Sequence, residues 1–144
     1  MARMINDIVA GRPLVSGTKD MTVRAASKLM AAKHVSALVI LDGKRIAGIF
    51  TERDAISKVL ADGLNPDKTP ISEVMASEPQ TVRAAMPVAF ALHMMVEGGF
   101  RHVPVVDDNG EAIGMVSARD ALGEDLVRLE REMERRDVLE NPLS

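Results

Sequence analysis

A chain of 144 residues is long enough for one ordinary domain or for two very small ones, and its 47% hydrophobic and 27% charged residues are typical of a globular protein. A formal net charge of −3 argues against a nucleic-acid-binding face, and the lack of cysteine excludes disulfides, thiolate zinc sites and cysteine nucleophiles. Because no apolar stretch could form a signal sequence or cross a membrane, we expect a soluble, cytoplasmic protein with neither nucleic acid nor membrane as a partner.

The sequence contains an internal repeat, with equivalent residues 65 or 66 positions apart. Three stretches carry it: residues 5–10 return as 71–76, residues 38–42 as 103–107, and residues 48–56 as 114–122. Chance similarity would not keep this register over a whole unit, so we divide the chain into repeat 1, residues 1–68, and repeat 2, residues 69–144. Each half is close to the size at which a separate core becomes marginal, so the halves should pack against each other.

Repeat 1 is predicted to contain a strand, a helix, two strands joined by a tight turn, and a second helix. In chain order these elements fall near residues 13–15, 23–30, 37–41, 46–50 and from Thr51 onward. The first helix follows from an apolar period near 3.6 residues, and the strand after it from a continuous aliphatic run. Asp42-Gly43 between the two strands is a strong hairpin signal.

Repeat 2 is predicted to contain the same elements in the same order, near residues 79–82, 88–95, 103–106, 112–116 and from Ser117 onward. Gly98-Gly99 should end its first helix, and residues 107–110 should form its hairpin turn. The two repeats together predict an α/β fold in which small mixed sheets are flanked by helices.

The last predicted helix, from Ala118 to about Arg136, is longer than its counterpart in repeat 1 and carries mixed charge. An apolar stripe runs along it through Leu122, Leu126, Leu129 and Met133. Such a helix packs back on its own domain or reaches across to a partner chain, and the sequence alone does not separate these two arrangements.

Each repeat carries a hydroxyl-x-x-aspartate motif where its last strand meets a helix: Thr51-Glu52-Arg53-Asp54 in repeat 1 and Ser117-Ala118-Arg119-Asp120 in repeat 2. One interpretation is structural, because a hydroxyl followed three residues later by a carboxylate is a capping box. The other is functional. A helix N-terminus at a sheet edge suits an anionic ligand, a carboxylate can accept two hydrogen bonds from a ribose diol, and Gly48 and Gly114 just before the motifs allow close backbone approach.

With these motifs, the aliphatic strands and the hairpins, the sequence resembles a tandem pair of CBS domains, also called a Bateman module, over nearly its whole length. The resemblance implies two β-α-β-β-α repeats packed about a pseudo-two-fold axis, with two related clefts between them. It implies that an adenosine ligand (AMP, ADP, ATP, or a related ligand such as S-adenosylmethionine or NAD) binds as a regulatory ligand, with no cofactor required. Asp54 or Asp120 would hold the ribose hydroxyls, with Thr51 or Ser117 beside it and the adenine between aliphatic side chains.

The resemblance also makes the two clefts unequal. The family places basic residues just before the second strand, where repeat 2 has Arg101 and His102 and repeat 1 has Ser36 and Ala37. We therefore expect the cleft with Arg101 and His102 to prefer phosphates, with Lys33 or His34 nearby. The candidate ligand-binding residues are Ser16, Ala37, Thr51, Arg53, Asp54, Thr81, Val82, Arg101, His102, Pro104, Ser117, Arg119 and Asp120.

Two other classes of function stay open. A docking or dimerisation module for a partner enzyme or transporter would use the same fold with empty clefts. An enzyme would need an acid, base or nucleophile set, and no motif of the sequence supplies one, so we expect neither catalysis nor a metal site from His34, His93 and His102. We further expect a homodimer through methionine-rich helix faces, and a separate, unidentified protein as the regulated partner.

Overall fold

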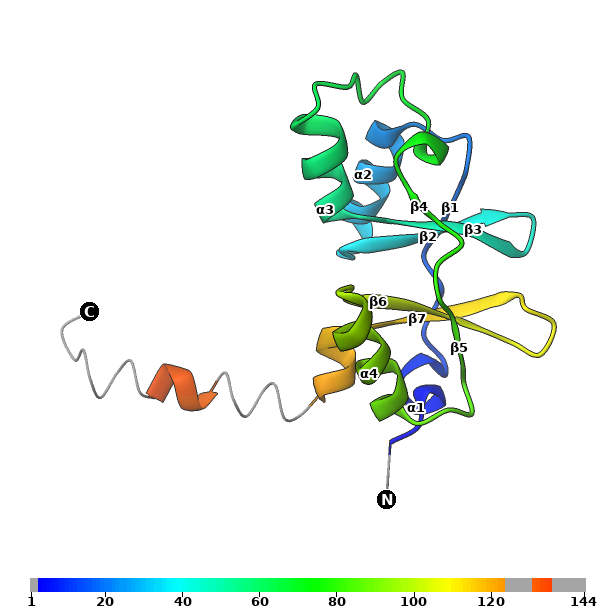
Figure 1. The fold of residues 1–144 in the computed structure, drawn as a ribbon, viewed down its shortest axis with the longest axis vertical. Coiled ribbons are helices and arrows are strands. Elements are labelled where there is room, and N and C mark those ends of the chain that lie inside the picture. The colour runs from blue at the N-terminus through cyan, green and yellow to red at the C-terminus, as the bar shows by residue number, and fades with distance from the viewer. Residues whose placement is uncertain (1–2, 124–130, 136–144) are drawn as a thin grey trace.

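The computed structural model describes residues 3–123 and 131–135, and it consists of two β/α halves whose sheets face each other (Figure 1). The upper half holds β1 (Ser16–Thr18), α2 (Val23–Lys33), β2 (Ala37–Asp42), β3 (Arg45–Thr51), α3 (Glu52–Asp54), the π-helix η1 (Ala55–Leu60), the 3-10 helix η2 (Ile71–Glu73) and β4 (Ala76–Ser77). The lower half holds α1 (Ile5–Val9), β5 (Val82–Arg83), α4 (Val88–Gly98), β6 (His102–Val106), β7 (Ala112–Ser117) and helical residues 118–123. The predicted fold class, two equivalent mixed β/α repeats, is confirmed.

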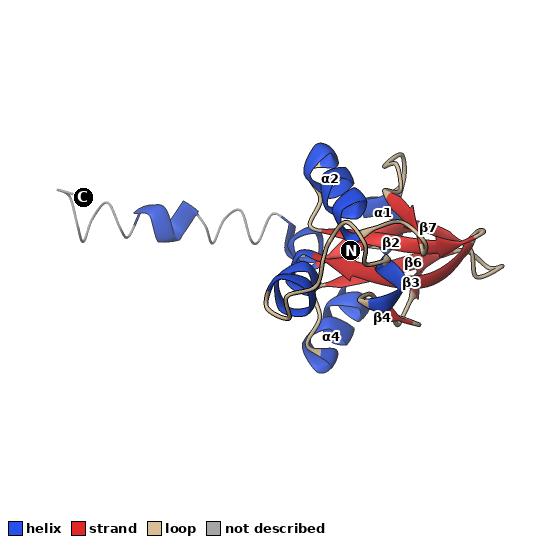
Figure 2. Cartoon of the chain, turned by 90° about the horizontal axis from the view of Figure 1, so that it is seen from above, coloured by secondary structure: helices blue, strands red, loops and turns tan. Residues whose placement is uncertain are grey.

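The two sheets share the topology of their first three strands, and the first sheet has one further strand, β4. The first has the order β1-β2-β3-β4 and the second the order β5-β6-β7. In each sheet the short first strand pairs parallel with the next one, which in turn forms the predicted antiparallel hairpin. Figure 2 shows the strands of both halves gathered together, with α2 and α4 on opposite flanks. The first strand of each repeat begins later than the sequence predicted, at Ser16 and at Val82, because that is where pairing with β2 and β6 starts.

Local signals in the sequence fix most element boundaries. The Thr22 hydroxyl accepts a hydrogen bond from the Ala25 N–H at 3.1 Å and caps α2. Gly99, with φ 73°, ends α4 as the Gly98-Gly99 pair predicted, and His34, with φ 56°, ends α2 in the same left-handed conformation. In the second hairpin, one Asp107 carboxylate oxygen accepts from two backbone N–H groups, which closes the predicted turn.

The repeats exchange short segments across their boundary. Ile5 and Val9 of α1 are buried in the core of the lower half, where the N–H of Ile5 donates to the carbonyl of Met86 at 2.9 Å. In return, Ile71 of η2 is buried in the core of the upper half, and its N–H donates to the carbonyl of Met21 at 2.8 Å. The boundary at residue 68 stays a prediction from the sequence repeat, while the packing ties each half to a segment of the other.

The glycines before the two motifs do allow close approach, and the neighbour is this chain itself. A Cβ built on Gly114 would lie 2.9 Å from a methyl carbon of Val9, and one on Gly48 would lie 2.8 Å from the carbonyl oxygen of Ala76. Contacts this short require glycine, because a side chain would push α1 away from β7 or β4 away from β3. The exchanged segments α1 and β4 therefore pack directly against β7 and β3, the strands that lead into the two motifs.

The described parts of the predicted C-terminal helix, residues 118–123 and 131–135, are helical. Leu122 is 38% exposed and Met133 is 58% exposed, whereas Leu126 and Leu129 lie outside the described residues. Among the described residues, no helix combines the length and the apolar character needed to span a bilayer.

Candidate functional site

A pocket of about 1170 Å³ lies between the repeats and is lined from both of them. Repeat 1 supplies the segment from Arg12 to Ser16 and the end of α2 with the residues that follow it, up to Ala37. Repeat 2 supplies Arg101, His102 and the corner where β7 enters the last helix. Its volume is slightly above the usual range for small-molecule sites, which is about 300–1,000 Å³, and most of its walls are apolar. The inter-repeat pocket, as we call it, is large enough for a nucleotide.

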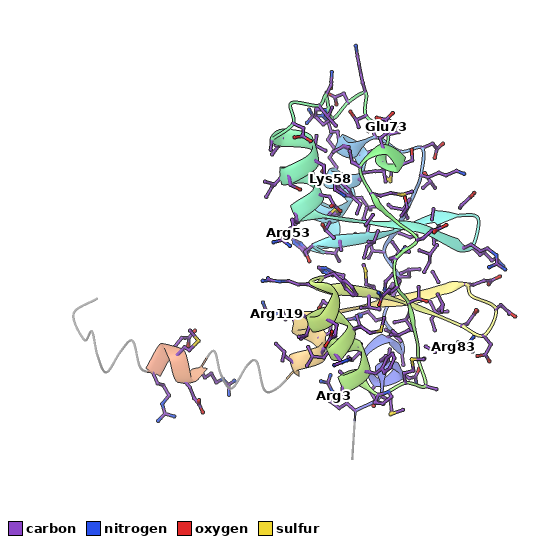
Figure 3. The ribbon with its side chains drawn as sticks, in the orientation of Figure 1. Arg3, Arg53, Lys58, Glu73, Arg83 and Arg119 are labelled. Carbon is purple, nitrogen blue, oxygen red and sulfur yellow. The ribbon has the colours of Figure 1, made fainter. Side chains whose placement is uncertain are left out.

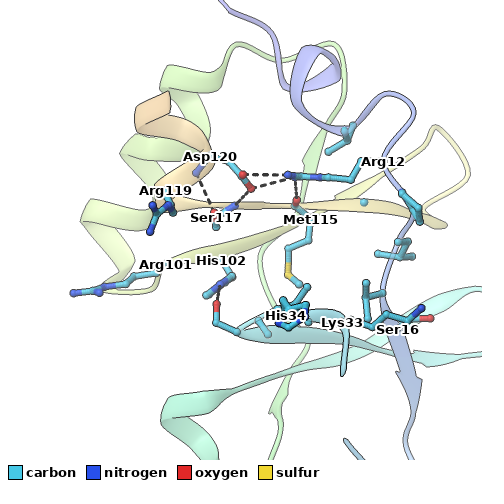
Figure 4. Close-up of a pocket in the computed structure, with 18 of the residues that line it drawn as sticks. Arg12, Ser16, Lys33, His34, Arg101, His102, Met115, Ser117, Arg119 and Asp120 are labelled. Atoms are coloured by element: carbon cyan, nitrogen blue, oxygen red, sulfur yellow. Dashed lines mark hydrogen bonds and ion pairs between the residues drawn. The ribbon is translucent and has the colours of Figure 1, made fainter. Parts of the chain in front are cut away.

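Figure 4 shows how the labelled polar side chains are arranged in this pocket. Arg101 and Arg119 lie toward one end and Ser16 toward the other, while Asp120 and Met115 lie between them. Lys33 and His34 lie toward the Ser16 end in the same view. Cationic side chains therefore lie toward both ends of the pocket, with the Asp120 carboxylate between them.

The Ser117-Asp120 corner forms the predicted capping box. The N–H of Ser117 donates to Asp120 Oδ2 at 2.9 Å, and the N–H of Asp120 donates to Ser117 Oγ at 3.0 Å. Thr51 and Asp54 form the same pair of hydrogen bonds in repeat 1, at 3.0 and 3.2 Å. The structural interpretation of the motif is therefore confirmed in both repeats, and in repeat 2 the capping carboxylate also faces the inter-repeat pocket.

The Asp120 carboxylate is also held by Arg12, from the segment that leads into β1. Arg12 Nη1 and Nη2 donate to the two oxygens of Asp120 at 3.1 Å each, and Nη2 donates to the carbonyl oxygen of Met115 at 2.8 Å (Figure 4). Burial by itself would raise the pKa of Asp120, but the hydrogen bonds from Arg12 and Ser117 and the charge of Arg12 outweigh it and hold the pKa below its usual value. Asp120 is therefore ionised at neutral pH and already paired.

His102 joins the repeats on the opposite wall of the pocket. Its Nε2 lies 2.9 Å from the Oγ of Ser36, so this hydrogen bond connects β6 of one repeat with the residue before β2 of the other. Burial lowers the pKa of His102; the carboxylates of Asp120 and Glu52 partly oppose this and the charge of Arg101 adds to it. His102 is therefore a neutral hydrogen-bonding group at pH 7 rather than a permanent cation.

The inter-repeat pocket is positively charged although the whole chain is acidic. Its lining includes four permanent cations, Arg12, Lys33, Arg101 and Arg119, against the single carboxylate of Asp120. Within residues 3–123 and 131–135, only Arg12 among these four lies in an ion pair. Such a concentration of positive charge in a concave site favours anionic ligands.

The structure brings seven of the thirteen predicted residues together in this pocket: Ser16, Ala37, Arg101, His102, Ser117, Arg119 and Asp120. Lys33 and His34 also line it, at the position expected for them. The other six, Thr51, Arg53, Asp54, Thr81, Val82 and Pro104, lie outside its lining.

Several of these six surround the equivalent corner of repeat 1. There, Asp54 Oδ1 forms an ion pair with Lys58 Nζ at 3.1 Å, and Lys58 lies one turn further along the same helical segment. Figure 3 shows Arg53 and Arg119 at the starts of the two helices that follow the motifs, where the halves meet. Val82 and Pro104 are buried in the core, so a ligand could reach them only through their backbone. A ligand role for these six stays a prediction.

Sequence reasoning missed Arg12, which makes the most extensive polar contacts of the pocket. Arg12 and Asp120 are 108 positions apart, and no local pattern links them. The repeat itself held one signal: Arg12-Pro13 aligns with Glu78-Pro79, so the two copies differ in charge at this position. The two copies of the repeat therefore differ in charge here as well as at Arg101 and His102.

Comparison with known proteins gives a consistent result. The family profile described as CBS domain matches residues 5–61 and again residues 71–126. The chain is 39% identical over 105 residues to the meiotically up-regulated gene 70 protein of Schizosaccharomyces pombe, and 40% identical over 115 residues to a CBS domain-containing protein of Arabidopsis thaliana. These matches cover 73% and 79% of this chain but only 14% and 21% of the two longer relatives.

Among solved structures, the chain is similar to a CBS domain protein from Pyrobaculum aerophilum complexed with AMP. The TM-score is 0.78, the sequence identity is 32%, and the match covers 88% of this chain and 96% of the other. The similarity therefore extends over both halves of the fold and includes a protein with a bound adenine nucleotide.

Proposed function

The chain belongs to the CBS domain family and carries two copies of the domain, and from this premise we propose that it is a regulatory module whose inter-repeat pocket binds an adenine nucleotide. The observation that carries the proposal is the convergence of Asp120, Arg101 and Arg119 from one repeat with Ser16 and Lys33 from the other on a single pocket. The AMP bound by the Pyrobaculum aerophilum relative supports the ligand class.

We propose that the nucleotide lies along the pocket with its phosphates toward Arg101 and Arg119. Its ribose would then face Asp120, and its base would lie among the aliphatic residues near Val15 and Met115. The chain has no Trp or Tyr and only three Phe, so adenine would be held by aliphatic side chains and backbone groups rather than by stacking. The positive charge of the pocket favours AMP, ADP or ATP over S-adenosylmethionine, whose sulfonium is itself cationic.

A ligand in this position would act by bridging the repeats. It contacts residues of both, so its binding favours the relative arrangement of the halves in which those contacts are made, by no more than its difference in affinity between arrangements. The pocket holds one hydroxyl–imidazole pair, Ser36 Oγ with His102 Nε2 at 2.9 Å, but no carboxylate in the described part of the chain is hydrogen-bonded to that imidazole to orient it. We therefore propose ligand recognition and no catalytic activity. A separate protein would receive the signal.

Thermal unfolding of the full chain with candidate ligands tests the proposal. We expect AMP, ADP and ATP at millimolar concentration to raise the Tm, since a ligand present at about 100 times its Kd stabilises the folded state by roughly 2.7 kcal/mol. S-Adenosylmethionine should raise the Tm less. If none of these ligands changes the Tm, the proposed function fails in favour of a ligand-free docking or dimerisation module.

The alternative docking function has some support of its own. Ile56 and Leu60 on η1 are 62% and 74% exposed, and Phe90 and Val96 on α4 are 47% and 75% exposed. These apolar side chains are consistent with a homodimer or a partner protein on the helical side of the molecule. Homodimerisation and a cytoplasmic location stay proposals, and both are compatible with nucleotide binding.

Binding should also depend on pH through His102. A phosphate group placed near His102 would raise its pKa from the low value that burial imposes, so the complex takes up a proton that the free protein does not hold. Affinity must then rise as the pH falls through the interval between the free and the bound pKa. We expect ATP to bind about threefold more tightly at pH 6 than at pH 8.

Isothermal titration calorimetry at pH 6, 7 and 8 measures this dependence, with His102→Gln as the comparison. The phosphates of ATP titrate in the same range, but they do so equally with both proteins, so only the difference between the two proteins is informative. Equal pH profiles for the wild type and His102→Gln would show that His102 does not approach the phosphates.

A further inference from the structure

Asp120 has too few free acceptor positions to bind a ribose in the structure as it stands. An ionised carboxylate accepts about four hydrogen bonds, two at each oxygen. Oδ2 already accepts from Arg12 Nη2 and from the N–H of Ser117, and Oδ1 accepts from Arg12 Nη1. A ribose diol that donates from both hydroxyls needs two acceptor positions, and about one remains. The diol and the bidentate guanidinium therefore compete for the same carboxylate.

We propose that Arg12 determines the specificity of the inter-repeat pocket, selecting phosphorylated nucleotides over neutral nucleosides by occupying Asp120 until an anionic ligand draws it away. The inference rests on the proposed function and concerns the same site. Arg12 is suited to this role because its ion pair with Asp120 is partly exposed, with the Arg12 side chain 42% and the Asp120 side chain 27% accessible, and because its bond to the Met115 carbonyl does not depend on the carboxylate. An ion pair at this depth can open without leaving a charge buried.

The selectivity follows from what each ligand offers to the displaced guanidinium. When a nucleoside takes Asp120, Arg12 loses its two carboxylate contacts and gains no new anion. When a nucleotide takes Asp120, its phosphates enter the same pocket, so Arg12 exchanges a carboxylate for a phosphate, with which guanidinium groups form equally strong paired hydrogen bonds. The free energy needed to open the ion pair therefore weakens the binding of adenosine. For ATP, the new contact between Arg12 and the phosphates largely offsets this cost.

The repeat 1 motif lacks this arrangement. Asp54 is paired with Lys58 on its own helix, at 3.1 Å, and Glu78 stands at the position that corresponds to Arg12. A lysine one turn away is a single point charge that does not form the two parallel bonds of a guanidinium. The paired contact of Arg12 with Asp120 therefore occurs at the motif of repeat 2 and not at the equivalent motif of repeat 1.

Calorimetric titration of the full chain with adenosine, AMP and ATP tests the role of Arg12. In Arg12→Met we expect adenosine to bind about fivefold more tightly than in the wild type, because the ion pair no longer has to open. ATP should bind no more tightly than before. The preference for ATP over adenosine should then fall at least fivefold.

Arg24→Met is the matched control, because Arg24 also donates from two guanidinium nitrogens to the two oxygens of one carboxylate, that of Asp67, and both residues lie outside the pocket lining. It removes the same charge from the chain and should leave the ratio of the two affinities unchanged. If circular dichroism shows that Arg12→Met is unfolded, Arg12→Lys replaces it; this variant keeps the charge without the paired geometry and should tighten adenosine binding by a smaller factor.

The outcomes separate this inference from the proposed function. If the wild type binds ATP but Arg12→Met binds adenosine no more tightly than the wild type does, the role of Arg12 is refuted and nucleotide binding stands. A crystal structure of the ATP complex in which Arg12 still donates hydrogen bonds to both oxygens of Asp120 would refute the role of Arg12 in the same way. If neither protein binds any of the three ligands, both proposals fall together.

Discussion

Replacing Asp120 by alanine should lower the affinity for ATP about a hundredfold while costing the free protein only about 1–2 kcal/mol of stability. The loss of affinity follows from two hydrogen bonds between the ribose and an ionised acceptor, each worth about 1.5–3 kcal/mol, partly offset because Arg12 is freed for the phosphates. The stability cost is small because the variant loses one cap and one partly exposed ion pair. Calorimetry and urea unfolding of the same preparation measure both quantities.

Asp54→Ala is the matched variant for this experiment. It removes the same kind of capping bond, which the N–H of Thr51 donates to the Asp54 carboxylate at 3.0 Å, and an ion pair of similar length, to Lys58 at 3.1 Å, but Asp54 lies outside the lining of the inter-repeat pocket. Asp54→Ala should destabilise the protein by a similar amount. It should leave the affinity of the inter-repeat pocket for ATP at the wild-type value. If the two variants affect stability alike and neither affects binding, both motifs serve only as helix caps.

The sequence predicted those features that depend on neighbouring residues. The hairpin turns, the helix stop at Gly98-Gly99 and the capping boxes at Thr51 and Ser117 each depend on a few consecutive positions, and the structure confirms them. The convergence of Arg101 and His102 with Lys33 and His34 was also predicted, but from the family resemblance, because the pairing of the repeats is a property of the whole fold.

What could not be predicted depends on contacts between distant residues. The apolar residues of α1 indicate that one face is buried, but they do not indicate which of two similar cores receives it. The bond between Arg12 and Asp120 requires the linker of one repeat to pass over the motif of the other, which no local pattern encodes. Both features have one origin: the segments before β1 and before β5 cross between the halves (Figure 1).

Because of that exchange, a core substitution in either segment should destabilise the opposite repeat rather than the repeat to which the segment belongs by sequence. Ile5 and Ile71 are equivalent in the repeat and both are fully buried, at 0% exposure, but each packs in the core of the opposite repeat. Truncating either to alanine should cost about 2–5 kcal/mol, the usual range for losing a large aliphatic side chain from a core. This is the largest effect on stability that we expect from a single substitution in these segments.

Hydrogen exchange measured by mass spectrometry should show where each loss falls. Ile5→Ala should weaken protection mainly in β6 and β7, although Ile5 belongs to repeat 1 by sequence, and Ile71→Ala should weaken it mainly in β2 and β3. If Ile5→Ala instead exposed β2 and β3, the repeats would fold as the sequence divides them and the exchanged packing would be wrong. An equal loss across both sheets in both variants would show that the two cores open as one unit, because α1 and η2 couple them too strongly for either half to open alone.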